Sequence, residues 1–173
     1  MPHYHVYGKI IFFDIPNNEY LLKLAYNLVS QSVTYRLGIN LYANLSQELL
    51  EKFNTNTCRE ERYIPFELLD NPLTNECSEI FDGIWIGRHD LIGIENSRLP
   101  TLESFFAQML TYEGISHLIV IFKDCHADLN AGMTEHEIEP NELCSVLTNA
   151  PRINTELPDV RLIVRRNHDV KNR

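Results

Sequence analysis

A polar cluster, Asp124-Cys125-His126-Ala127-Asp128, directly follows the most apolar stretch of the chain and contains residue types that do chemistry. A cysteine beside a histidine can serve as a nucleophile with its base, which would pair Cys125 with His126 or with His136. Adjacent residues at a strand end point to opposite faces, however, so Cys125 and His126 are poorly placed to share one proton. We favour a polar strand end here. The alternative is a small cytosolic enzyme that uses Asp124, His126 and Asp128.

Two further patterns contain histidines that could bind a metal or act in catalysis. His3 and His5 lie two residues apart, which places both on one face of an extended strand, but nothing nearby in the sequence supplies an obvious third ligand. Arg88-His89-Asp90 places a carboxylate beside a histidine, although these residue types are also ordinary in tight turns. We therefore expect structural roles for these histidines, and no metal or cofactor.

An acidic segment is the most informative feature of the charge pattern. Between positions 124 and 151 the chain has no Lys or Arg, and its acidic residues there are Asp124, Asp128, Glu135, Glu137, Glu139 and Glu142. In an extended strand the alternating glutamates from 135 to 139 would present three carboxylates on one side. One interpretation is a solvated acidic loop near the basic residues that follow Arg152. The other is a docking surface for a basic protein.

Length and composition predict one globular domain that folds without disulfides. The chain has 173 residues, of which 44% are hydrophobic and 23% charged, and no run approaches the roughly 18 apolar residues that a membrane span requires. We see no secretory signal, so we expect a cytoplasmic protein with reduced cysteines. A formal net charge of −9 opposes direct binding to nucleic acid or to an anionic membrane and favours a basic partner.

The apolar run at 115–122 predicts a central strand that is buried on both faces. Directly before it, apolar residues spaced three and four apart from Leu102 to Tyr112 predict a helix, which Gly114 ends. Strand alternation puts His117, Ile119 and Ile121 on one face, and we expect all three in the core. Alanine at either isoleucine should then leave a cavity, and His117 should be neutral and hydrogen-bonded.

The remaining patterns predict an α+β fold in a single domain spanning residues 1–173, with a mixed or mostly antiparallel sheet packed by a few helices. Asn17 or Asn18 should cap a helix that ends near 30–32. The other predicted elements are strands at 4–13, 33–42 and 160–166, helices at 44–53 and 141–147, and a hairpin formed by 80–86 and 91–94.

Three stretches resemble the immunity proteins of bacterial contact-dependent growth inhibition systems. They are His3-Tyr4-His5-Val6-Tyr7-Gly8-Lys9, Phe81-Asp82-Gly83-Ile84-Trp85-Ile86-Gly87 and Leu102-Glu103-Ser104-Phe105-Phe106. The resemblance implies a small, acidic α+β protein without enzymatic activity. It also implies a partner, the cognate toxin domain, often a nuclease, which the immunity protein neutralises by tight stoichiometric binding. The family assigns no binding residue to a numbered position of this chain.

Overall fold

The computed structural model of the chain describes residues 3–14, 16–41, 63–69, 84–85, 99–124, 133–149 and 159–166. Its elements follow the order β1 (His3–Phe12), α1 (Asn18–Thr34), β2 (Gly38–Leu41), β3 (Tyr63–Leu69), β4 (Ile84–Trp85), α5 (Leu99–Met109), β5 (Ile115–Asp124), β6 (Met133–Ile138), the 3-10 helix η4 (Pro140–Glu142), α6 (Leu143–Asn149) and β7 (Asp159–Arg165). None of the helices in these ranges is long and apolar enough to cross a membrane.

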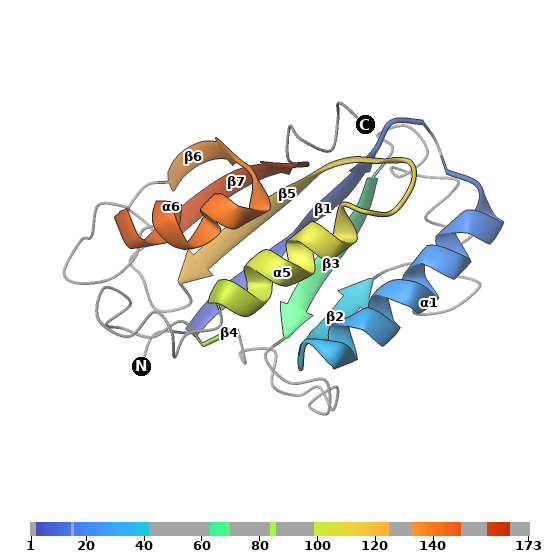
Figure 1. Cartoon of the computed structure of the whole chain (residues 1–173), viewed down its shortest axis with the longest axis horizontal. Coiled ribbons are helices and arrows are strands. Elements are labelled where there is room, and N and C mark those ends of the chain that lie inside the picture. Colours follow the sequence, from blue (N-terminus) through green and yellow to red (C-terminus); the bar gives the residue numbers. More distant parts are fainter. Residues whose placement is uncertain are drawn as a thin grey trace.

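The strands form one mixed sheet in the order β2-β3-β1-β5-β7-β6, and the short β4 pairs with the start of β1 (Figure 1). All neighbouring strands run antiparallel except β6 and β7, which are parallel. A parallel pair needs a crossover connection, and α6 lies in the connection between these two strands. The predicted α+β fold class with a mostly antiparallel sheet is therefore confirmed.

The helices α1, α5 and α6 bury their apolar sides in the same core as one face of the sheet, and Figure 1 shows α5 and α6 in front of the strands. In α5 the side chains of Leu102, Phe105, Phe106 and Met109 are 0% exposed, as their spacing predicts. The side chain of Arg166 donates hydrogen bonds to the carbonyl oxygens of Leu110 (2.6 Å) and Tyr112 (3.0 Å), which satisfies backbone acceptors just beyond this helix. The sheet thus has a face toward the helices, hereafter the helix face, and an opposite face.

The helix α1 begins as predicted and ends later than predicted. The Asn17 side chain accepts a hydrogen bond from the backbone N–H of Tyr20 at 2.8 Å and so caps the helix. The helix then continues to Thr34, so the prediction of a strand from 33 to 42 is wrong at its start, and β2 covers only Gly38–Leu41. The turn between them is made at Arg36, whose φ of 57° stops the helix.

The predicted central strand is confirmed as β5, but its predicted faces are wrong. The pairing of β1 with β5 shifts between Ile11 and Phe12, whose partners are His117 and Ile115, so Ser116 is an extra, bulged residue. Ile115 is buried before the bulge, the bulge inverts the alternation after it, and the buried residues that follow are Leu118, Val120 and Phe122. His117, Ile119 and Ile121 consequently lie on the opposite face and are only half-buried.

Of the remaining predicted elements, some are found in the structure and others lie outside the described residues. The predicted last helix is found at 140–149 as η4 and α6, and the last strand is found as β7. The predicted helix at 44–53 and most of the hairpin at 80–94 lie outside the described residues. Of that hairpin, only Ile84–Trp85 is described, as β4, and it pairs with His3 and Tyr4 of β1.

Candidate functional site

The candidate site lies on the face of the sheet opposite the described helices. Strand alternation brings side chains from five strands to this face in rows that cross the sheet. One row runs along the register pairs Glu67, Tyr7, Ile121, Arg161 and Glu135. The next row is Pro65, Lys9, Ile119, Ile163 and Glu137. This face is therefore apolar along β5, with Lys9 on β1 and Arg161 on β7 beside it, and its β6 side carries the two glutamates.

A hollow of about 590 Å³ lies over the apolar centre of this face. The described residues that line it are Tyr7, Gly8, Lys9, Leu41, Pro65, Phe66, Glu67, Ile119, Ile121 and Arg161. The ammonium group of Lys9 lies 4.4 Å from the centre of the Tyr63 ring, a cation–π contact at the margin of this surface. The hollow can hold an apolar group, with charged groups available at its rim.

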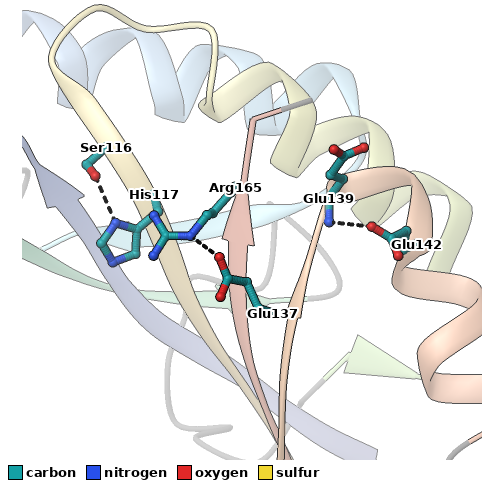
Figure 2. Close-up of polar contacts among 6 residues, drawn as sticks. All are labelled: Ser116, His117, Glu137, Glu139, Glu142 and Arg165. Atoms are coloured by element: carbon teal, nitrogen blue, oxygen red, sulfur yellow. Dashed lines mark hydrogen bonds and ion pairs between the residues drawn. The ribbon is translucent and has the colours of Figure 1, made fainter. Parts of the chain in front are cut away.

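Two ion pairs connect β6 with β7. Glu135 Oε2 lies 3.0 Å from Arg161 Nη1, and Glu137 Oε1 accepts a hydrogen bond from Arg165 Nε, as Figure 2 shows for the second pair. The two glutamate side chains are nevertheless 57% and 60% exposed. Exposed ion pairs of this kind contribute little to stability because water and salt screen both charges. The two carboxylates thus remain accessible to an outside cation.

The other two acidic residues of the described segment serve as a helix cap. Glu139 follows the last residue of β6, and its backbone N–H donates to Glu142 Oε1 at 3.0 Å (Figure 2). The Glu139 side chain in turn accepts from the backbone N–H of Glu142. This reciprocal capping box fixes the start of η4. The acidic segment therefore ends in an ordered turn.

The remaining predicted site residues include Asp124 and His136, which the structure describes, and others that it does not. Asp124 is the last residue of that strand, whereas Cys125, His126 and Asp128 lie outside the described residues, as does Arg88-His89-Asp90. His136 is on the helix face of β6, two residues before the buried Ile138, and its Nε2 atom is buried without a hydrogen-bond partner among the described residues. Within the described ranges, no three His, Cys, Asp or Glu residues are grouped in a way that could hold a metal ion.

A polar cluster that the sequence patterns did not predict surrounds His117. Ser116 Oγ lies 2.9 Å from His117 Nδ1, and Figure 2 shows Arg165 between the imidazole and Glu137. Burial, and after it the positive charge of Arg165, lower the pKa of His117, whereas Glu137 acts in the opposite direction. A serine beside a neutral imidazole resembles half of a catalytic triad, but the nearby carboxylate is bound by Arg165 and does not orient the ring.

The pH dependence of stability should report this environment. The pKa of His117 is lower in the folded protein than in the unfolded chain, where it is about 6.5. Between the two pKa values the unfolded state binds more protons, so the stabilising contribution present above pH about 6.5 is lost as the pH falls through the folded pKa. Urea unfolding at neutral and mildly acidic pH should show a smaller loss for His117→Gln than for the wild type. Equal losses would show that His117 does not titrate in this way.

Cys144 is the cysteine that falls within the described residues, and its thiol is not activated. It is free and half-buried in α6, where burial and the Glu103 carboxylate raise the pKa of the thiol to about 12. A thiol must ionise to act as a nucleophile, so Cys144 is inert at neutral pH. The prediction of a partly buried cysteine is confirmed for this residue.

Comparisons with protein families, with characterised proteins and with solved structures found no match to this chain. The site must therefore be interpreted from its own geometry and charge. Sequence reasoning selected Glu135 and Glu137, but it missed Arg161, Arg165 and the Ser116–His117 pair. The arginines at 161 and 165 share one strand parity, and so do the glutamates at 135 and 137; this pattern of opposite charges is the signal that would have indicated neighbouring strands.

Proposed function

We propose that this chain is an immunity protein, which binds a cognate bacterial toxin domain and neutralises it. The observation that carries the proposal is the acidic edge of the domain, defined as Glu135 and Glu137 on β6 with Glu139 and Glu142 at η4. The first two carboxylates of this edge are more than half exposed, and the whole chain has a net charge of −9. Such a surface fits a strongly basic partner.

A toxin that cleaves nucleic acid supplies the matching surface. Its active site must be basic to hold phosphate groups, so carboxylates that cover the same region exclude the substrate. The pairs with Arg161 and Arg165 do not prevent this binding, because a surface ion pair is weak and a carboxylate can accept several hydrogen bonds. The charges should act mainly on the association rate, as they do at the rim of other interfaces.

The proposal is tested by the growth of bacteria that produce the toxin. We expect the reading frame next to this gene to encode a large secreted toxin, whose C-terminal domain stops growth when produced alone. Co-production of this chain should restore growth. The variant Glu135→Gln with Glu137→Gln should slow association of the two purified proteins at low salt.

The matched control for this experiment is Asp14→Asn with Glu19→Gln, which changes the net charge equally at two exposed positions away from the acidic edge. We expect its association rate to stay close to that of the wild type. A toxic neighbouring product that this chain neither binds nor neutralises would contradict the proposed function. Equal slowing by both double variants would show that net charge, and not the acidic edge, attracts the toxin.

A further inference from the structure

The strand β6 occupies the end of the sheet, and its backbone has a described neighbour on one side only. Among the described strands it pairs with β7 alone, and Figure 1 shows it beyond β7 at the outer end of the sheet. A strand in this position presents backbone N–H and C=O groups that can pair with an added strand. The segment Met133–Ile138 contains neither proline nor glycine, so nothing in its composition blocks such pairing.

The side chains of β6 decide which strand could be added. On the face opposite the helices, the exposed Met133 is followed by Glu135 and Glu137, and Met133 is 52% exposed. Side chains directly opposite each other on neighbouring strands interact, and like charges in such positions are destabilising. A second copy of β6 would place carboxylates near carboxylates. A strand with Lys or Arg at alternate positions would instead place its cations beside Glu135 and Glu137.

We infer that the edge of β6 binds an extended segment of the toxin in which Lys or Arg alternates with uncharged residues, adding one strand to the sheet. This inference rests on the proposed function and specifies how the partner is held. Main-chain hydrogen bonds supply the attachment, and the glutamates select basic residues at alternate positions. In the free protein Arg161 and Arg165 hold the same carboxylates, so they compete with the incoming cations.

The competition between Arg161 and an incoming cation for Glu135 can be tested with matched variants. Glu135→Gln and Arg161→Gln break the same ion pair, so they should change stability alike. Their effects on binding should be opposite, because the first removes the carboxylate and the second frees it. The probe is a short synthetic peptide of alternating lysine and valine, with an alternating glutamate and valine peptide as control. Binding is measured from NMR shifts and from hydrogen exchange of the backbone amides.

We expect the lysine peptide to shift and protect amides within 133–138. Glu135→Gln should weaken its affinity about threefold, the effect of one exposed ion pair, whereas Arg161→Gln should leave the affinity unchanged or raise it. The glutamate peptide should not bind. The inference is wrong if the shifts lie elsewhere or do not occur, if both variants weaken binding alike, or if both peptides bind equally. It is also wrong if the protein dimerises through β6.

The same hydrogen-exchange measurement on the toxin complex separates this inference from the proposed function. A toxin that is bound and neutralised without protection of the amides at 133–138 would overturn the edge inference and leave the immunity function intact. Binding of the lysine peptide at β6, together with a neighbouring product that is not neutralised, would show that the edge can bind a basic strand and would contradict the immunity function.

Discussion

Replacing Leu118 with alanine is expected to lower the free energy of unfolding by about 2 to 5 kcal/mol, a large share of the roughly 5 to 15 kcal/mol available to a domain. Leu118 lies in the middle of β5 on the helix face, and its side chain is 0% exposed. The substitution removes apolar atoms from a packed interior and leaves a cavity that the surrounding strands and helices cannot fully close. Urea unfolding followed by circular dichroism measures the loss.

Ile119→Ala is the matched control, because the residue is adjacent in the same strand and loses a side chain of the same size. Ile119 lies on the opposite face and is only half-buried, so its replacement should cost about 1 kcal/mol. A cost for Ile119→Ala equal to or greater than that for Leu118→Ala would show that the bulge at Ser116 does not set the faces of β5 as described.

Gly8→Ala should destabilise the protein by about 3 kcal/mol or more, because overpacking against backbone atoms cannot be relieved by a side-chain rotation. A Cβ atom at Gly8 would lie 1.8 Å from the carbonyl oxygen of Ile119 and 3.1 Å from the Cα of Val120. Both are backbone positions of β5, the strand paired with β1, so the two central strands would have to separate. Thermal unfolding or urea unfolding measures the change.

Gly114→Ala provides the comparison for a glycine with space around it. The nearest atom to a Cβ there is the Tyr20 hydroxyl at 3.9 Å, and the cost arises from the φ of 87°, about 1 to 2 kcal/mol. A smaller loss for Gly8→Ala than for Gly114→Ala would contradict the close approach of β1 to β5.

The elements with strong local patterns could be predicted from sequence. The apolar residues of α5 and of β5 are stable only where a core buries them, so their patterns predict a buried helix and a buried strand. Asn17 is a typical helix cap. These signals depend on residues close together in the chain. Together they were sufficient to predict the fold class.

The faces of β5 could not be predicted, because residues of both parities from 118 to 122 are apolar and alternation alone cannot choose between them. The choice is made by the bulge at Ser116, which depends on the pairing with β1. The environment of His117 likewise depends on Arg165, which is distant in sequence and becomes a neighbour only when β5 pairs with β7. Both features that sequence reasoning missed, the faces of β5 and the environment of His117, depend on pairing between strands that are distant in the sequence.

The central claim, that this chain is a stoichiometric inhibitor of a toxin, is tested most directly by titration. The purified C-terminal domain of the neighbouring toxin is held at a concentration well above the dissociation constant, and its activity on nucleic acid is measured as this protein is added. The account predicts a linear fall in activity that reaches zero at equal molar amounts. Full activity at equal amounts, or complete loss at a small fraction of the toxin concentration, as an enzyme acting on the toxin would produce, would contradict it.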